Sequence, residues 1–233
     1  MKKIALISFL GTLGLYAQSI YATFDVEAQK SASVAFSSSG IVKNIHVDIG
    51  SIVKENEVLA TLHSDDVKAL LDTHKTTLKY AKKDLDRQQK VKTIIDKERF
   101  DSYAFKYESA KANVAYQQAL LDKTVLKAPF EGLITSKEIE SGDVVSGQMI
   151  KTAFGIQSVS KRKLILKFDQ KYHNVVKVGD AFSYKVDGDD TTYNGVIYKV
   201  YPTIDTSDRK VVAEVKANDI PVGLFGDGYI TVK

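Results

Sequence analysis

The sequence predicts a mainly β protein, elongated in outline, in which an α-helical hairpin splits a small β-domain and a small β-barrel follows. Three observations support this fold class. Glycine and proline are absent from residues 65–121, where apolar side chains recur at heptad spacing. Short strand-like segments bounded by glycine lie on both sides of that stretch. After residue 160 the chain alternates short strands with Gly- and Asp-rich turns, which indicates a barrel.

The N-terminus has the layout of an export signal. Lys2 and Lys3 precede an apolar run over residues 4–15, and small residues follow at Ala17, Ser19 and Ala22. The run is shorter than the roughly 20 residues that usually span a bilayer. We therefore predict a signal peptide over residues 1–22, cleaved near Ala17 to Ala22; an uncleaved anchor or a buried helix is the alternative.

Charge and cysteine content exclude several classes of protein. The net charge of +4 falls to +2 when Lys2 and Lys3 are removed with the signal, and basic residues are interspersed with acidic ones. Such a balance does not favour nucleic acid as a partner. The chain has no cysteine, so disulfides, thiolate metal sites and lipid attachment through an N-terminal cysteine are excluded.

The first half of the predicted β-domain covers residues 23–64. Gly40 opens a strand with apolar residues at alternating positions, and Gly50 marks a tight turn before Ile52 and Val53. Residues 58–62 supply a further strand. We expect both glycines to be structural, since tight turns and close backbone approaches favour this residue.

The helical hairpin is predicted over residues 65–122. Two heptad patterns, each about four repeats long, indicate an antiparallel coiled coil. The phase breaks between Ile95 and Phe100, and Asp96 suits a helix N-cap, so the turn is expected near residues 93–97. The expected seam residues are Val67, Leu71, His74, Leu78, Ala81, Leu85, Gln88, Lys92 and Ile95, then Phe100, Tyr103, Tyr107, Ala110, Val114, Gln117 and Leu121.

The second half of the β-domain, residues 123–160, repeats the pattern of the first. Gly132 opens a strand as Gly40 does, and Gly142 precedes a β-branched pair as Gly50 does. Two related half-motifs around a helical insertion predict one sandwich completed from both sides. Residues 161–233 form the predicted barrel, with strands expected over residues 164–169, 182–186, 194–201, 210–216 and 228–232.

No motif in the sequence indicates an enzyme or a cofactor. The four histidines are scattered without metal-ligand spacing, and one methionine remains after removal of the signal. The chain contains no nucleophile triad order and no phosphate-binding loop. Arg209, which follows a turn and precedes a strand, is a candidate for a bridge to Asp205 or to a neighbouring subunit.

Several motifs resemble the periplasmic adaptor proteins, also called membrane fusion proteins, of the HlyD-like type. Residues 40–62 resemble the first lipoyl half-motif, and Leu126-Lys-Ala-Pro-Phe-Glu-Gly-Leu-Ile134 with residues 141–147 is similar to the second. Residues 195–209, with Pro202 and Arg209, resemble the barrel segment of the family. The resemblance implies a lipoyl-like, barrel-sandwich hybrid domain formed by residues 23–64 and 123–160.

The resemblance also implies a function in efflux. Adaptors of the resistance–nodulation–division (RND) type sit in the periplasm at the inner membrane, where about six copies bridge a transporter and an outer-membrane channel of the TolC type. The hairpin tip makes the channel contact, and its expected residues here are Arg87, Val91, Ile94, Asp96 and Glu98. The tip departs from the family pattern, because Val91 replaces a leucine and Asp96 or Glu98 replaces a serine.

Three other functions compete with this one. A lipoyl or biotinyl carrier would present a modified lysine at a tight turn between its halves, where this chain has the whole hairpin. An adaptor for type I protein or peptide secretion, or for ABC-type export, would have an uncleaved anchor and a longer hairpin. A free-standing module would use the barrel as a ligand site. The sequence ends soon after the last predicted barrel strand and leaves little room for the membrane-proximal domain of many family members. The motifs therefore do not identify the region that contacts a transporter.

Overall fold

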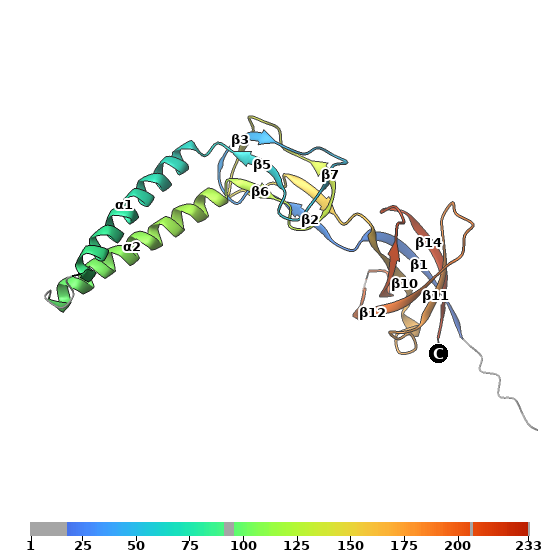
Figure 1. The fold of residues 1–233 in the computed structure, drawn as a ribbon. Coiled ribbons are helices and arrows are strands. Elements are labelled where there is room, and N and C mark those ends of the chain that lie inside the picture. Colours follow the sequence, from blue (N-terminus) through green and yellow to red (C-terminus); the bar gives the residue numbers. More distant parts are fainter. Residues whose placement is uncertain (1–17, 91–95, 206, 233) are drawn as a thin grey trace, which may run out of the picture. The chain divides into compact units, whose positions relative to one another are not determined.

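The computed structural model describes residues 18–90, 96–205 and 207–232 (Figure 1). The chain folds as two compact units. One, within residues 30–159, forms a sandwich with the helical hairpin, and the other combines residues 18–29 with the described residues from 160 onward, which form a barrel. Each unit has its own core of buried apolar side chains. In the described part, no helix is both long and apolar enough to cross a bilayer.

The sandwich contains two four-stranded sheets. Their orders are β2-β9-β7-β4 and β6-β5-β3-β8, and all neighbouring strands are antiparallel. The strands are β2 (Ser31–Val34), β3 (Gly40–Ile45), β4 (Ile52–Val53), β5 (Val58–Leu62), β6 (Val125–Lys127), β7 (Gly132–Lys137), β8 (Val144–Val145) and β9 (Phe154–Gln157).

The two sheets are related by an internal pseudo-two-fold repeat. In one sheet Gly40 and Ile41 of β3 pair with Val145 and Val144 of β8. In the other, Gly132 and Leu133 of β7 pair in the same way with Val53 and Ile52 of β4. Each half therefore lends a short strand to the sheet of the other half, which confirms the sandwich predicted from the repeated half-motifs.

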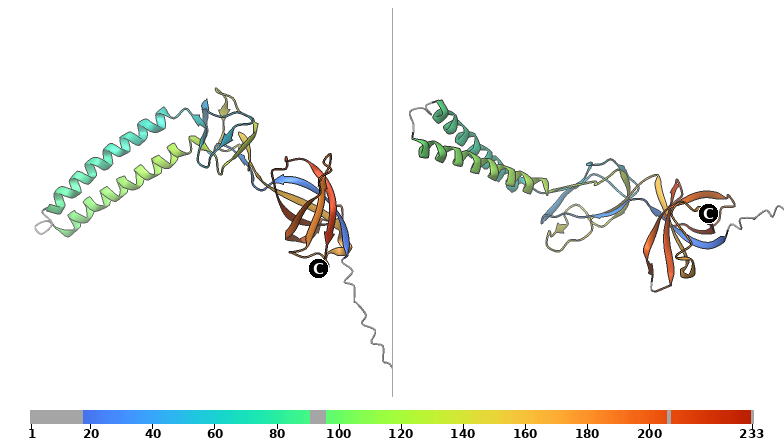
Figure 2. Two further views of the ribbon diagram at one scale, coloured as in Figure 1. Left: turned by 45° about the vertical axis from the view of Figure 1, so that its right-hand side comes forward. Right: turned by 90° about the horizontal axis from the view of Figure 1, so that it is seen from below.

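The hairpin enters this sandwich between β5 and β6. Helix α1 (Asp65–Lys90) and helix α2 (Lys97–Asp122) run antiparallel, as Figures 1 and 2 show. Every predicted seam residue that the structure describes is buried or partly buried; Lys92 and Ile95 lie outside the described residues. The heptad spacing therefore predicted the contact face of both helices, because a 3.5-residue repeat keeps one stripe toward the partner.

The barrel closes from six strands in the order β1-β10-β13-β12-β11-β14, all antiparallel. Five of them, β10 (Lys161–Asp169), β11 (Ala181–Val186), β12 (Tyr193–Asp205), β13 (Lys210–Asn218) and β14 (Phe225–Thr231), lie at the predicted places. A short 3₁₀ turn, η1 (Gln170–Tyr172), follows β10. Figure 2 shows the closed wall that these strands form with β1.

The sixth strand corrects the sequence prediction. We expected residues 23–28 in the sandwich, but they belong to β1 (Ser19–Ala28), which pairs with β10 and β14 of the barrel. Burial alternates along the whole strand: Ile20, Ala22, Phe24, Val26 and Ala28 face the core. The prediction was wrong because the edges of β10 and β14 need a partner to close the barrel, and β1 pairs with both.

The predicted signal also overlaps this strand. Residues 1–17 lie outside the described residues, whereas Ser19 to Ala22 are paired with Thr231 to Gly228 of β14. Ile20 and Ala22 are fully buried. Of the three cleavage points expected from sequence, only the one after Ala17 leaves every residue of β1 in the chain.

Candidate docking surfaces

The described residues near the tip of the hairpin are exposed and charged. Arg87, in the last turn of α1, forms an ion pair with Asp84 one turn earlier. Asp96 precedes α2, and its carbonyl oxygen accepts a hydrogen bond from the Phe100 amide at 3.1 Å. Its side chain makes no capping hydrogen bond. Glu98 lies exposed in the first turn of α2, where a negative charge favours the helix dipole.

Two of the five predicted tip residues, Val91 and Ile94, lie outside the described residues. The structure therefore places Arg87, Asp96 and Glu98 at the described margins of the turn. All three side chains are exposed, so they are accessible to a partner rather than used for the hairpin's own packing.

The hairpin has two unlike lateral faces beside its seam. On α1, the residues that follow the seam positions from Leu71 to Leu85 are all charged, whereas those that precede them are mostly uncharged. The charged set is Asp72, Lys75, Lys79, Lys82 and Asp86, and the other set begins Leu70, Thr73, Thr77 and Tyr80.

A groove of about 550 Å³ lies on the less charged face. It is lined by both helices, including Thr77 and Tyr80 of α1 and Ser109 and Asn113 of α2. The hydroxyls of Thr73 and Thr77 donate to the carbonyl oxygens four residues earlier at 3.0 and 3.1 Å. Because these hydroxyls are already bonded within the helix, the threonines are less polar toward a partner than their composition suggests.

One seam residue lacks a hydrogen bond. Gln117 is 8 % exposed, and its Oε1 atom is buried without a partner in the described structure. A buried amide oxygen without a partner destabilises the fold. The heptad spacing predicted Gln117 as a seam residue, and its burial shows that this polar side chain lies inside the seam.

The predicted glycines hold the two halves of the sandwich together. Gly50 and Gly142 have φ of +87° and +96°, the left-handed region that favours glycine, within turns closed by Ser51 and Asp143 amides. Each donates its amide across the repeat, Gly50 to the Ile134 carbonyl and Gly142 to the Val42 carbonyl, both at 2.9 Å.

Gly40 and Gly132 begin strands rather than turns. A Cβ atom at Gly132 would lie 2.6 Å from the Gln157 carbonyl oxygen of the neighbouring strand, so only glycine fits without a shift of the backbone. At Gly40 the nearest atom would be the Leu62 Cδ1 at 3.2 Å, a tight contact that a side chain could relieve. The two equivalent positions therefore differ in how strongly they need glycine.

Arg209 occupies a turn between β12 and β13. Its φ is +56°, and its amide donates to the Asp205 carbonyl oxygen at 2.8 Å. The Asp205 carboxylate instead accepts hydrogen bonds from the Ser207 hydroxyl and amide, and the hydroxyl bond leads the causes that lower its pKa. The predicted Arg209–Asp205 contact is thus made by the backbone.

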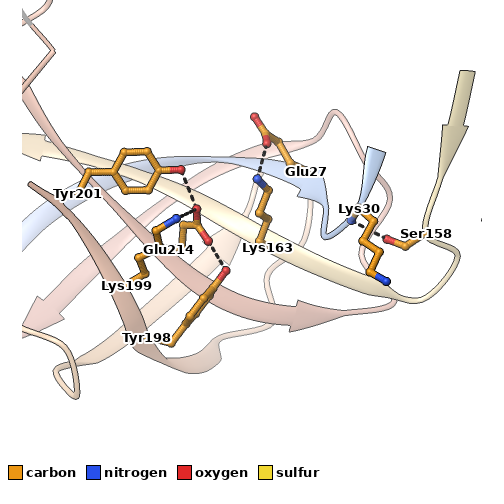
Figure 3. A network of polar contacts seen from close by, with 8 residues as sticks. All are labelled: Glu27, Lys30, Ser158, Lys163, Tyr198, Lys199, Tyr201 and Glu214. Atoms are coloured by element: carbon orange, nitrogen blue, oxygen red, sulfur yellow. Dashed lines mark hydrogen bonds and ion pairs between the residues drawn. The ribbon is translucent and has the colours of Figure 1, made fainter. Parts of the chain in front are cut away.

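A polar cluster on the outer face of the barrel was not predicted (Figure 3). Glu214 of β13 is 5 % exposed and accepts hydrogen bonds from the hydroxyls of Tyr198 and Tyr201, the latter at 2.7 Å. Lys199 lies 3.5 Å from the same carboxylate. The register of β12 against β13 shifts between Ile197 and Lys199, which lets both Tyr198 and Tyr201 reach one carboxylate.

The cluster determines the charge state of Glu214. Burial alone would raise the pKa of this carboxyl, but hydrogen bonds from the two tyrosines and the charges of Lys199 and Lys163 outweigh burial and lower it. Burial and the bond to Glu214 raise the pKa of Tyr198. The hydrogen bond to Glu214 is also the main cause that raises the pKa of Tyr201. A carboxylate beside two neutral phenols fixes the bulged part of β12 to β13.

The described residues contain no group of three or more His, Asp or Glu side chains that could hold a metal ion. The candidate sites are therefore surfaces. They are the charged residues near the hairpin tip, the groove between the two helices, and the Glu214 cluster on the outer face of the barrel.

Known structures share this fold. A chimera of MacA carrying the α-hairpin domain of Pseudomonas aeruginosa MexA superimposes with a TM-score of 0.85 at 20 % identity, covering 93 % of this chain and 82 % of the chimera. MacA from Actinobacillus actinomycetemcomitans gives 0.80 at 19 % identity, covering 93 % and 79 %. The membrane fusion protein Spr0693 from Streptococcus pneumoniae R6 gives 0.75 at 14 % identity, covering 92 % and 99 %.

At these identities the likeness concerns the fold alone. A search of curated protein sequences finds no significant match. The model of one domain family does match, over residues 30–156, a range that begins with the sandwich strand β2 and runs through the hairpin to β9. The match covers more than half of the sequence, and the chain therefore belongs to the family of CzcB-like barrel-sandwich hybrid domains.

Proposed function

We propose that this protein is a periplasmic adaptor subunit of an efflux system, bridging an inner-membrane transporter of the RND type and an outer-membrane channel of the TolC type. In this role several copies, about six, assemble around the export path for drugs or other small compounds. The protein acts by binding partners and not as an enzyme, in keeping with its family and structural neighbours.

The observation that carries this proposal is the hairpin inserted into the sandwich. Each arm has 26 residues and is about 39 Å long at the rise of an α-helix. Only Leu71, Ala110 and Gln117 of these arms are buried in the described structure. A helical pair with so small a core of its own is suited to contacts with other helices.

The hairpin tip is the proposed contact with the channel. Arg87, Asp96 and Glu98 are exposed there, and Val91 and Ile94, the other two residues expected at the tip, lie outside the described residues. Asp96 is informative because its side chain makes no capping hydrogen bond in the hairpin. A loss of channel binding on its replacement would therefore reflect a lost contact, not a damaged helix.

Export to the periplasm is part of the same proposal. Lys2, Lys3 and the apolar run of residues 4–15 support an export signal. The pairing of Ser19 to Ala22 in the barrel favours cleavage after Ala17 over the two later points. Sequencing the N-terminus of the mature protein tests this: Gln18 as the first residue is expected, and an intact Met1 would favour the anchored secretion-type adaptor.

The test of the adaptor role is co-purification from detergent extracts, followed by crosslinking to the channel. We expect a transporter and a channel to be recovered with the wild-type protein. Arg87→Ala, Ile94→Asp and Asp96→Ala should each reduce crosslinking at least tenfold, while the circular dichroism spectrum stays unchanged. Lys75→Ala, on the charged lateral face away from the tip, is the control and should crosslink normally.

The identity of the recovered transporter decides between the two adaptor classes. An RND-type transporter supports the proposal, and an ABC-type or type I secretion transporter would replace it with the alternative. An adaptor role would be contradicted if neither a transporter nor a channel were recovered and the wild-type protein and the tip variants crosslinked only to other copies of themselves.

A further inference from the structure

A groove on the outer face of the barrel combines aromatic rings with carboxylates. It has a volume of about 290 Å³ and lies between β1, β14 and the turn that follows β11. Its lining residues are Tyr21, Thr23, Phe24, Asp25, Asp187, Phe225, Gly226 and Asp227. The charged residues of this lining, as far as the structure describes it, are three aspartates, with no lysine or arginine among them.

Strand geometry places the exposed side chains of the groove on one surface, because alternate residues of a strand face the same side of a sheet. On β1, Thr23 and Asp25 are exposed, whereas Phe24 between them is buried. On β14, which pairs with β1, Phe225 and Asp227 are exposed. These four exposed side chains therefore share the outer face of the barrel.

Phe225 has an acidic residue on each side of it. Across the β1–β14 ladder its register partner is Asp25. On the other side, the Asp187 amide donates a hydrogen bond to the Phe225 carbonyl oxygen at 2.9 Å. The Phe225 side chain is 58 % exposed, so its ring contributes little to the core of the barrel. An exposed ring between two carboxylates is therefore not explained by packing.

Two of the three carboxylates of the groove have no ion pair with another described residue. Asp25 lies 3.8 Å from the Lys167 ammonium, whereas Asp187 and Asp227 have no cationic group within ion-pair distance in the described part of the chain. Lys185 of β11 is the register partner of Asp227, but it does not line the groove. The groove thus carries negative charge that its described neighbours leave available to a ligand.

From the shape and charge of the groove we infer that it binds a small organic cation, an ammonium ion that carries an apolar body. Aromatic faces attract such cations through the ring quadrupole and also pack against apolar groups. The aspartates supply the complementary charge. This ligand site goes beyond the bridging role proposed above and does not depend on it.

The dimensions of the groove favour an organic ion over a metal ion or a large partner. The described residues contain no group of three or more acidic or histidine side chains that could hold a metal ion, so the aspartates are spaced for a larger cation. Small-molecule pockets measure roughly 300–1,000 Å³, and the groove lies at the lower end of that range. One small molecule therefore fits it better than a folded protein surface does.

The backbone around the groove is held by hydrogen bonds that extend past the start of β14. The Val26 amide donates to the Leu224 carbonyl oxygen at 2.8 Å, and the Gly223 amide donates to the Val26 carbonyl oxygen at 3.0 Å. Side chains on such paired strands keep their spacing without a ligand. Binding therefore costs little ordering of the protein, which favours affinity for a small molecule.

The test is a titration of the mature chain, beginning at Gln18, by isothermal calorimetry at physiological salt, which screens long-range attraction. Benzyltrimethylammonium is the cationic probe, and benzylsulfonate has a similar apolar body with a negative head group. We expect benzyltrimethylammonium to bind at least tenfold more tightly than benzylsulfonate. Trilysine, which presents the cations of a basic protein segment, is titrated in parallel and should bind more weakly than benzyltrimethylammonium.

Variants of the groove are compared with matched controls. Asp187→Asn, Asp227→Asn and Phe225→Ala should each weaken the binding of benzyltrimethylammonium at least fivefold. Asp190→Asn removes the same charge from the same connection between β11 and β12, outside the lining of the groove, and should bind as the wild type does. Tyr116→Ala removes a ring of the hairpin that is 62 % exposed and should also leave binding unchanged. Circular dichroism checks that all five variants are folded.

Several results would overturn the inference. The first is no binding of benzyltrimethylammonium, and the second is equal binding of benzylsulfonate, which would reduce the groove to a nonselective apolar contact. Tighter binding of trilysine would assign the groove to a basic peptide instead. Equal losses in Asp190→Asn and Asp187→Asn, or unchanged binding in Phe225→Ala, would show that the net charge of the barrel and not the groove attracts the probe. None of these results bears on co-purification with a transporter and a channel, so the ligand site and the adaptor role are tested independently.

Discussion

The hairpin and the barrel are stabilised in opposite ways. The barrel surrounds a core that includes Phe24, Phe168 and Phe182, each at most 2 % exposed, and its sheet closes on itself. The described part of the hairpin has one narrow seam, of which Leu71 is the best buried apolar residue, and it contains one buried amide oxygen without a partner. Burial of apolar area is the main stabilising contribution to folding, so the barrel should be rigid on its own and the hairpin adaptable until partners cover it.

The largest effect is expected from removal of the first strand. A chain beginning at Thr23 lacks Ser19 to Ala22, which pair with β14, whereas a chain beginning at Gln18 keeps them. The shorter chain should lose the cooperative unfolding of the barrel, because Ile20 and Ala22 leave the core and β14 loses part of its partner.

Hydrogen exchange followed by mass spectrometry separates the two regions in this experiment. Amides of β10 to β14 should lose protection in the shorter chain, while those of α1 and α2 keep theirs. Equal protection of the barrel in both chains would show that the first four residues of β1 contribute nothing to closure.

A matched pair of core truncations compares the two regions directly. Phe24→Ala removes a ring that contacts Phe182 and Tyr184 at centroid distances of 5.9 and 5.2 Å, and should destabilise the barrel by about 3–5 kcal/mol. Leu71→Ala in the seam should cost the hairpin about 2–3 kcal/mol, at the low end for leucine, because a two-helix ribbon can collapse around the vacancy. Chemical denaturation with separate probes of each region measures both, and a larger loss in the hairpin would reverse the comparison.

The Glu214 cluster makes barrel stability depend on pH. The pKa of Glu214 is lowered in the folded protein, so its contribution to stability is complete above the ordinary glutamate pKa of about 4.3 and disappears as the pH falls through the folded value. Glu214→Gln should destabilise the barrel by about 1–3 kcal/mol at neutral pH and flatten the loss of stability in acid.

The measurement is the unfolding free energy of both proteins at several pH values between 7 and 3, spanning the titration range of a carboxyl group. The difference between wild type and variant should shrink toward low pH. Lys171→Gln, an exposed charge elsewhere on the barrel, controls for the general effect of removing a charge. A difference that is independent of pH would show that the cluster acts through packing alone.

The smallest effect has the opposite sign. Gln117→Leu should stabilise the hairpin by about 1 kcal/mol, because an apolar side chain of similar size removes the buried oxygen that lacks a partner. Thermal unfolding of the helices by circular dichroism measures it, with Gln118→Leu on the solvent side as the control. Destabilisation by Gln117→Leu would indicate that Gln117 is satisfied by water or by a second copy.

Patterns that depend on local spacing were read correctly from the sequence. The heptads predicted which side chains of α1 and α2 meet, since both helices follow one repeat. The repeated glycines predicted the sandwich, since the half-motifs need the same turns. Neither prediction required knowledge of which strand lies beside which.

Three features were decided only by the tertiary structure. Ile20 and Ala22 fit the end of an export signal and residues 23–28 fit the start of the sandwich, and only pairing with β10 and β14 assigns the whole strand to the barrel. Glu214 reads as one more surface charge until the register shift in β12 brings two tyrosines to it. The equivalence of the pairs Ile41–Val144 and Leu133–Ile52 also depends on strands from both halves of the repeat meeting in one sandwich.

The sequence by itself thus determined the kinds of element and their order, because helix and strand periodicity are local properties of the chain. The tertiary structure decided which distant segments complete each core and which apolar residues stay outside. Those outcomes depend on long-range pairing, whose register is set by contacts between residues as far apart as Ser19 and Thr231.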